Sequence, residues 1–178
     1  MIITRAQQKA LNLSILFVWF IIYSYLGWLY ETIFCSLDAG RFVNRGFLYG
    51  PFCPIYGSCI LFMILLFSGR FKSKLFLFLS CALFASGLEY VVSFSMEHLF
   101  GRRWWDYSNR LLNINGRICL GAAIMFGVSG VLVISYLHPN LVRYMNENYR
   151  LVWLRMAAKF MLAIFLLDLL VSVQMSLS

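Results

Sequence analysis

The sequence predicts an all-α membrane protein, a polytopic bundle of about five transmembrane helices. Hydrophobic residues make up 62% of the 178 residues, and the mean hydropathy is +0.79. A soluble domain of this composition would expose far too much apolar surface to water. The basic residues fall mostly between apolar runs, and these runs approach the roughly 20 residues that a helix needs to cross a bilayer.

Five apolar segments justify that helix count. They lie at about residues 11–37, 47–68, 75–100, 118–137 and 151–173. Pro51 and Pro54, near the start of the second segment, predict a kinked or partly unwound entry, which is tolerated where protein rather than lipid surrounds it. We expect a single membrane domain over residues 1–178.

Two helical hairpins, at about residues 11–68 and 75–137, are predicted to be pseudo-symmetric, because they share one order of residues. Each has a glutamate inside an apolar run, then a polar loop, then an asparagine with an adjacent arginine and glycine. The residues are, in turn, Glu31, Asn44 and Arg45, and Glu89, Asn115 and Arg117. Charges within a membrane span are costly, so two such sets in parallel positions indicate a site.

Helical spacing places the glutamates on small polar stripes, which must face protein or water. The stripe of the third segment consists of Ala82, Ser86, Glu89, Ser93 and Glu97, and that of the first of Ser24, Gly27, Glu31 and Cys35. A third stripe, suited to close helix approach, consists of Cys119, Ala123, Gly127 and Gly130. We expect one composite polar site where the two hairpins meet.

Two interpretations of the glutamates remain open. In one, Glu31 and Glu89 line a substrate or ion pathway with Arg45 and Arg117. In the other, each glutamate pairs with an arginine only to hold a loop over the bundle. Two further carboxylates belong to this question. For Glu97, near the end of its span, the structural interpretation is favoured. Asp168 has no obvious partner and could serve a site or a contact between subunits.

The loop after the third segment carries Trp104, Trp105 and Asp106 among arginines. Paired tryptophans are typical of the aromatic belt at a membrane surface. The alternative is a lid in which arginines and aromatic rings grip a headgroup, a cation or an organic substrate.

The sequence contains no pattern typical of metal binding, ATP hydrolysis or nucleophilic catalysis. Neither His98 nor His138 has metal-ligand spacing, no Walker A pattern occurs, and no nucleophile set is recognisable. We therefore expect no metal site and no cofactor, and an enzyme is less favoured than a transporter. The net charge of +8 suits an anionic membrane surface, with lipids as partners, better than nucleic acid.

Loop charges predict the orientation. In a five-span arrangement nine lysines and arginines lie on the N-terminal side and six on the other, and all four lysines lie on the N-terminal side. This predicts a multi-pass protein of the cell membrane with a cytoplasmic N-terminus and outward-facing motif loops.

Several strings resemble the CmpB-like family, which is described as ABC-transporter permeases of type IV. They are YLGWLYE (25–31), NRGFLYGP (44–51), GLEY (87–90), WWDYS (104–108) and NGRI (115–118). The resemblance implies a small bacterial permease that works with a separate ATPase subunit. The polar stretch 139–148 is the nearest candidate for the ATPase contact.

Three functions follow, in order of preference. The first is a permease that moves a small or lipid-like substrate through a Glu/Arg-lined site. We expect it to be a homodimer, because five spans leave little room for a transport pathway within one chain. The predicted substrate-binding residues are Glu31, Asn44, Arg45, Glu89, Trp104, Trp105, Asp106, Asn115 and Arg117. The second is a membrane enzyme acting on a lipid or lipid-linked substrate, and the third is a non-catalytic membrane partner protein.

Overall fold

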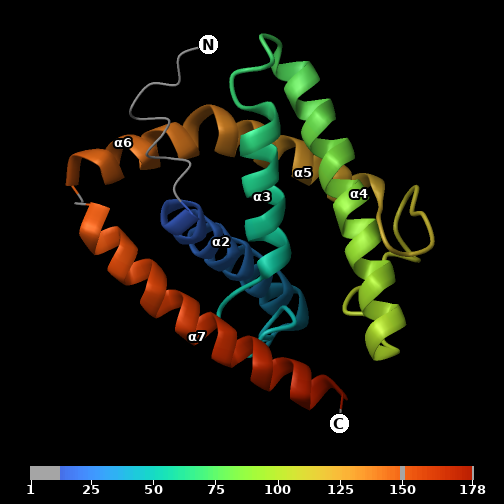
Figure 1. Ribbon diagram of the computed structural model, residues 1–178. Helices are drawn as coiled ribbons and strands as arrows, with labels where there is room; N and C mark the ends of the chain where they lie inside the picture. Colours follow the sequence, from blue (N-terminus) through green and yellow to red (C-terminus); the bar gives the residue numbers. More distant parts are fainter. Residues whose placement is uncertain (1–12, 149–150, 178) are drawn as a thin grey trace. The chain divides into compact units, whose positions relative to one another are not determined.

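The computed structural model describes residues 13–148 and 151–177, and helices account for most of them (Figure 1). The elements are α2 (Leu13–Ala39), α3 (Pro54–Phe67), α4 (Lys74–Phe100), α5 (Leu120–Leu132), the π-helix η1 (Val133–Leu137), α6 (His138–Asn148) and α7 (Leu151–Leu177). Within the described residues there is no strand, only an isolated bridge between Ile114 and Ile118. The predicted all-α class is confirmed.

Among the described residues, four helical stretches are long and apolar enough to cross a membrane. They are Leu13–Ala39, Lys74–Phe100, Leu120–Glu147 and Trp153–Ser176. The shorter α3 has 14 residues, or about 21 Å at 1.5 Å per residue, against a hydrocarbon core of roughly 30 Å. The chain is therefore a multi-pass helical membrane protein, while the count of five spans and the hairpin symmetry remain predictions.

The segment expected at residues 47–68 is helical only from Pro54, and residues 47–53 are irregular. Proline is well placed at the first position of a helix, because its missing N–H would have no intrahelical acceptor there. Pro51 disfavours helix in the residue before it. The expected unwound entry is thus present, and it extends further than the apolar composition suggests.

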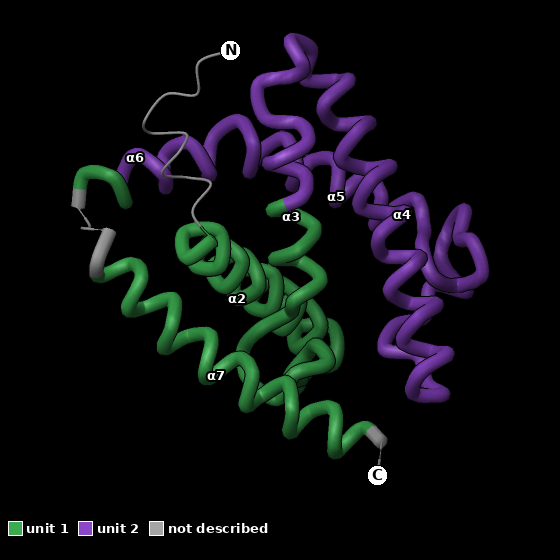
Figure 2. The backbone as a smooth tube through the Cα atoms, viewed as in Figure 1, with its two compact units in different colours: residues 1–61, 145–178 green, residues 62–144 purple. Residues whose placement is uncertain are grey.

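The chain divides into two compact units, residues 1–61 with 145–178 and residues 62–144, and the two boundaries fall within α3 and α6 (Figure 2). In the first unit α2 packs against α7. Phe165 of α7 meets the rings of Phe17 and Phe20 edge-on, with centroids 6.2 and 5.4 Å apart. Such aromatic contacts stabilise helix pairs beyond the area that they bury.

Two glycines allow α2 and α3 to cross closely. A methyl group on Gly57 would lie 2.5 Å from the carbonyl oxygen of Phe20 and against the Ser24 hydroxyl, and one on Gly27 would strike the Tyr56 ring. The crossing also fixes the chain entering α3, because Cys53 donates its backbone N–H to the Ser24 carbonyl at 3.0 Å. Small residues are therefore required at this crossing.

In the second unit α4 packs on α5, and glycines again line the contact. A methyl group on Gly127 would lie 2.5 Å from the Phe78 ring, and one on Gly130 would lie 2.5 Å from Cys81. These are members of the small-residue stripe expected in the fourth segment, so its role in close helix approach is confirmed.

A π-helical turn, η1, joins α5 to α6, so the polar stretch expected at residues 139–148 continues a helix. Lys74, the first residue of α4, donates a 2.6 Å hydrogen bond to the Ser135 hydroxyl and lies 5.1 Å from the Tyr136 ring centroid. The start of α4 is thereby attached to η1.

Candidate functional site

The first polar network lies in the first unit and is built around Glu31. This residue stands eight positions, or about 12 Å along the axis, before the end of α2. Arg45 donates to Glu31 Oε1 from Nε at 3.1 Å and from Nη2 at 2.9 Å, and the Cys53 thiol lies 3.6 Å from Oε2. The side chains of Arg45 and Glu31 are 27% and 22% exposed. The ion pair therefore attaches the loop to α2.

Asn44 belongs to the same network. Its Oδ1 accepts a 2.7 Å hydrogen bond from the Trp28 indole, and its Nδ2 donates to the Tyr49 carbonyl at 3.2 Å. Ser36 adds a further tie, since its hydroxyl accepts from the backbone N–H of Val43 at 2.9 Å. The asparagine of the motif thus shapes its own loop.

Asp168, on α7, holds the end of this loop. Its carboxylate accepts hydrogen bonds from the backbone N–H of Tyr49 at 3.1 Å and of Gly50 at 3.0 Å, and from the Ser172 hydroxyl at 3.4 Å. Asp168 therefore has partners within its own unit. No pattern of side chains could reveal them, because the main donors are backbone groups.

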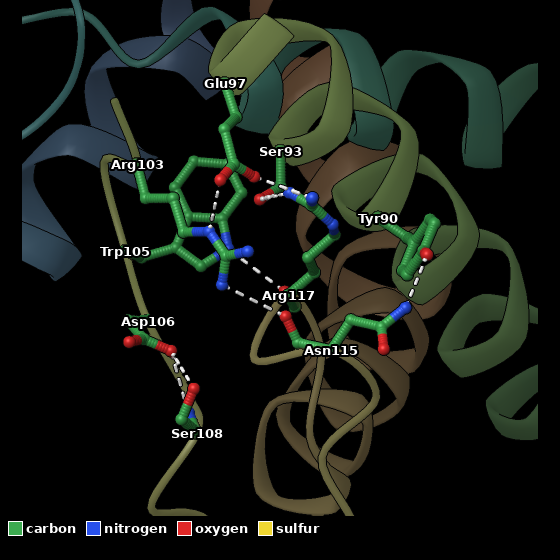
Figure 3. A network of polar contacts seen from close by, with 9 residues as sticks. All are labelled: Tyr90, Ser93, Glu97, Arg103, Trp105, Asp106, Ser108, Asn115 and Arg117. Carbon is green, nitrogen blue, oxygen red and sulfur yellow. Dashed lines mark hydrogen bonds and ion pairs between the residues drawn. The ribbon is translucent and has the colours of Figure 1, made fainter. Parts of the chain in front are cut away.

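The second network lies in the second unit and is built around Glu97 (Figure 3). Glu97 accepts from Arg103 Nε at 2.9 Å and pairs with Arg117 Nη2 at 2.6 Å. Arg117 also donates to the Ser93 hydroxyl at 3.3 Å, and its side chain is only 10% exposed. Outside the span, hydrogen bonding to Glu97 raises the pKa of Arg103 above its ordinary value.

The loop between α4 and α5 is attached to this network at several points (Figure 3). Asn115 donates to the Tyr90 hydroxyl at 2.9 Å, and its carbonyl accepts from Arg103 at 3.2 Å. The Trp105 indole donates to the Arg117 carbonyl at 3.0 Å. Trp105 and Asn115 therefore serve to hold Arg117 and its loop.

The other two predicted residues of this loop make local contacts. Asp106 accepts from the Ser108 backbone at 2.9 Å and from the Ser108 hydroxyl at 2.5 Å, and these bonds lower the pKa of Asp106. Trp104 packs edge-on against Phe100, with centroids 5.5 Å apart, and Arg102 stacks on it at 4.6 Å.

Glu89 occupies a different position. It lies eleven residues, or about 17 Å, before the end of α4, and it is 6% exposed. Its Oε1 accepts a 3.1 Å hydrogen bond from the Tyr107 hydroxyl, and Tyr107 is fixed in turn by a 2.7 Å bond from its N–H to the Gly116 carbonyl. Ser86 and Ser93, on the same stripe, are buried as well. A carboxylate this deep in a span must be accommodated by protein.

The structure therefore groups the predicted residues by repeat. Glu31, Asn44 and Arg45 form one network, and Asn115, Arg117 and Trp105 belong to another. Sequence reasoning left several participants out of the predicted site, namely Trp28, Cys53, Tyr90, Ser93, Glu97, Tyr107, Asp168 and Ser172. The position of Ser93 and Glu97 on the Glu89 stripe was the available signal for those two.

Among the described residues no three His, Cys, Asp or Glu side chains come together as a metal-binding group. Cys35, Cys53, Cys59, Cys81 and Cys119 are free thiols, four of them buried. Such cysteines behave as small apolar side chains.

The fold and the two networks define a multi-pass helical membrane protein with carboxylates held inside its spans. The model of the family described as "Putative ABC-transporter type IV" matches residues 18–173, and the chain belongs to this family. The family's description suggests that the chain is a component of an ABC transporter. No curated protein matches the chain, and no solved structure does so.

Proposed function

We propose that the chain is the membrane-spanning subunit of an ABC-type transporter that moves a small or lipid-like substrate across the cell membrane. Its family and its long apolar helices support this function. The excess of lysine and arginine on one side supports a cytoplasmic N-terminus with outward-facing motif loops.

Glu89 is the group that we propose for binding the substrate or a coupling proton. The observation that carries this proposal is its burial in the middle part of α4, beside the buried Ser86 and Ser93. A carboxylate at such depth costs free energy, and an ionisable residue inside a span is therefore a candidate functional group. Tyr107 would position it through the phenol hydrogen bond.

The remaining predicted residues would act around Glu89 and Glu31. The Glu31–Arg45 and Glu97–Arg117 pairs hold their loops in place, and this supports a shaping role for Asn44, Arg45, Asn115 and Arg117. Paired charges of this kind fix geometry more than they add stability.

Energy would come from a separate ATPase subunit. We place its contact on α6, which is polar, amphipathic and rich in exposed side chains such as Arg143, Tyr144 and Glu147. We also propose a homodimer, because the number of spans leaves little room for a pathway within one chain.

Affinity purification from native membranes followed by mass spectrometry tests the function. An ATPase subunit should co-purify with the tagged chain, and Arg143→Glu should release it while the chain remains inserted and folded. Arg155→Glu, on α7, is the matched control that should retain it. A folded, inserted chain that brings down no ATPase would contradict the proposal.

The closed ion pairs favour a second candidate, a non-catalytic membrane partner that assembles a complex. In that case Glu89→Gln would change only folding or complex formation. Loss of bound ligand from a folded Glu89→Gln variant would exclude it.

A further inference from the structure

The loop between α4 and α5 presents an apolar tip that nothing in the proposed transport site uses. Leu111, Leu112 and Ile114 are 74%, 70% and 54% exposed. We define these three residues as the apolar tip. Single exposed apolar side chains are ordinary, but three within four positions of one loop form a patch that suits an apolar partner.

The tip is held in place by hydrogen bonds. Arg110 donates its N–H to the Tyr107 carbonyl at 2.8 Å, and Asn113 Nδ2 donates to the carbonyls of Ser108 and Arg110, both at 3.0 Å. Ile114 donates to the Ile118 carbonyl at 3.0 Å. The leucines are therefore presented by a defined turn.

The backbone of the turn is strained at Leu112. Leu112 has a φ of +49°, in the left-handed region that bulky residues rarely adopt. Strained positions persist where the surrounding structure determines them, and they often serve a function. Here the strained residue is one whose side chain is held outward.

The position of the apolar tip relative to the membrane spans indicates that lipid covers it. The loop leaves the α4 span at Phe100 and returns at Leu120, the first residue of the next apolar span. Leu120 donates its N–H to the Leu111 carbonyl at 3.2 Å. This bond holds the start of the tip beside the first residue of a candidate membrane span, so we expect the tip near the bilayer surface.

The charge beside the tip fits a lipid surface. Arg110, next to Leu111, is exposed, and so is Arg102 in the same loop. The loop's other two arginines, Arg103 and Arg117, pair with Glu97. An arginine at this depth can reach lipid phosphates while apolar neighbours enter the acyl boundary.

We propose that the apolar tip inserts into the headgroup–acyl boundary of the bilayer and anchors the loop that carries Tyr107 and Arg117. The occupant of the patch is thus lipid, and the tip sets the height of the loop over the end of α4.

Spin labelling of the full chain in vesicles of phosphatidylethanolamine and phosphatidylglycerol tests this. With the five native cysteines replaced by alanine, Leu112→Cys is labelled and compared with Asn109→Cys, an exposed polar position of the same loop. The label at residue 112 should collide more often with oxygen than with a water-soluble nickel chelate, and the label at residue 109 should do the reverse. Equal access of the chelate to both labels would overturn the proposal, and so would a label at residue 112 that both reagents fail to reach, because protein would then cover the tip.

Hydroxyl-radical footprinting of the unmodified chain in the same vesicles gives a second measurement that does not depend on the cysteine-free variant. Leu111 and Leu112 should be protected from oxidation in vesicles despite their exposure in the fold. Oxidation at the rate of a free leucine peptide would contradict lipid insertion.

Discussion

The two polar networks start from the same order of residues and close in different ways. In the first, Glu31 pairs directly with Arg45 of its own repeat. In the second, Arg117 pairs with Glu97, and Glu89 accepts from Tyr107. Eight residues after Glu31 stands Ala39, whereas eight residues after Glu89 stands Glu97. Glu97, the additional carboxylate on the stripe, thus pairs with Arg117. The deeper Glu89 accepts a hydrogen bond from the Tyr107 hydroxyl instead.

This difference suggests two roles for the motif glutamates, fastening a loop and binding a ligand, which the repeated sequence alone does not distinguish. A part-exposed pair such as Glu31–Arg45 fastens a loop near the end of a span. Glu89 lies deeper in its helix and is more buried, which fits the binding role that we propose for it. The following substitutions break or sharpen the comparison, from the largest expected effect to the smallest.

Arg117→Ala should destabilise the protein most, because the Arg117 side chain is only 10% exposed and its removal breaks the contacts to Glu97 and Ser93 together. Arg45→Ala should cost about 1 kcal/mol, because the Arg45 side chain is 27% exposed and its ion pair is partly screened by water. Thermal unfolding of both variants in the same detergent measures the two effects. Equal losses would mean that the deeper burial of Arg117 relative to Arg45 does not decide the cost of its removal.

Gly57→Ala should destabilise by about 2 kcal/mol, because the new methyl group meets the backbone oxygen of Phe20, which cannot rotate away. Gly127→Ala should cost less, since its nearest neighbour is the Phe78 ring. Gly87→Ala is the control, as a methyl group there meets nothing within 4 Å, and it should be neutral or slightly stabilising. If Gly87→Ala lowered the unfolding midpoint as much as Gly57→Ala does, the close α2–α3 crossing would be contradicted.

Tyr107→Phe should cost about 1 kcal/mol, the usual contribution of one hydrogen bond. The same change should weaken ligand retention more than Tyr49→Phe does, because Tyr49 contacts Asp168 through its backbone N–H. Native mass spectrometry of the two purified variants makes the comparison. If both retain ligand equally, Tyr107 does not position the site.

The smallest effect concerns pH. Hydrogen bonds from Ser108 hold the pKa of Asp106 below its ordinary value, so this carboxylate contributes stability above about pH 4 and loses it as the pH falls through the lowered pKa. Ser108→Ala should therefore flatten the acid side of the stability profile. Unfolding midpoints of the wild type and of Ser108→Ala, measured across the acidic pH range, should show this difference. Identical pH profiles for the two proteins would refute the role of the Ser108 hydrogen bonds.

The helices were largely predictable from sequence, because long apolar runs report membrane spans directly. The third segment, expected at 75–100, is found at Lys74–Phe100. The second was the least accurate, because residues 47–53 are as apolar as a helix while Pro51 and Pro54 prevent one from starting earlier. Hydropathy cannot separate an apolar loop from an apolar helix.

The partners within the networks were less predictable. The Glu31–Arg45 pair follows the repeated motif, but the choice of Glu97 over Glu89 by Arg117 depends on the path of the loop. Asp168 could not be assigned from side chains, since Tyr49 and Gly50 bind it through backbone N–H groups that any sequence would supply.

Ligand retention in Glu89→Gln and Glu31→Gln is the most direct test of the proposed division of tasks. Native mass spectrometry of gently purified wild-type protein should detect a bound small molecule or lipid, and thermal unfolding should confirm that both variants are folded. We expect the ligand to be lost from Glu89→Gln and kept by Glu31→Gln. Loss from Glu31→Gln with full retention by Glu89→Gln would contradict the central claim.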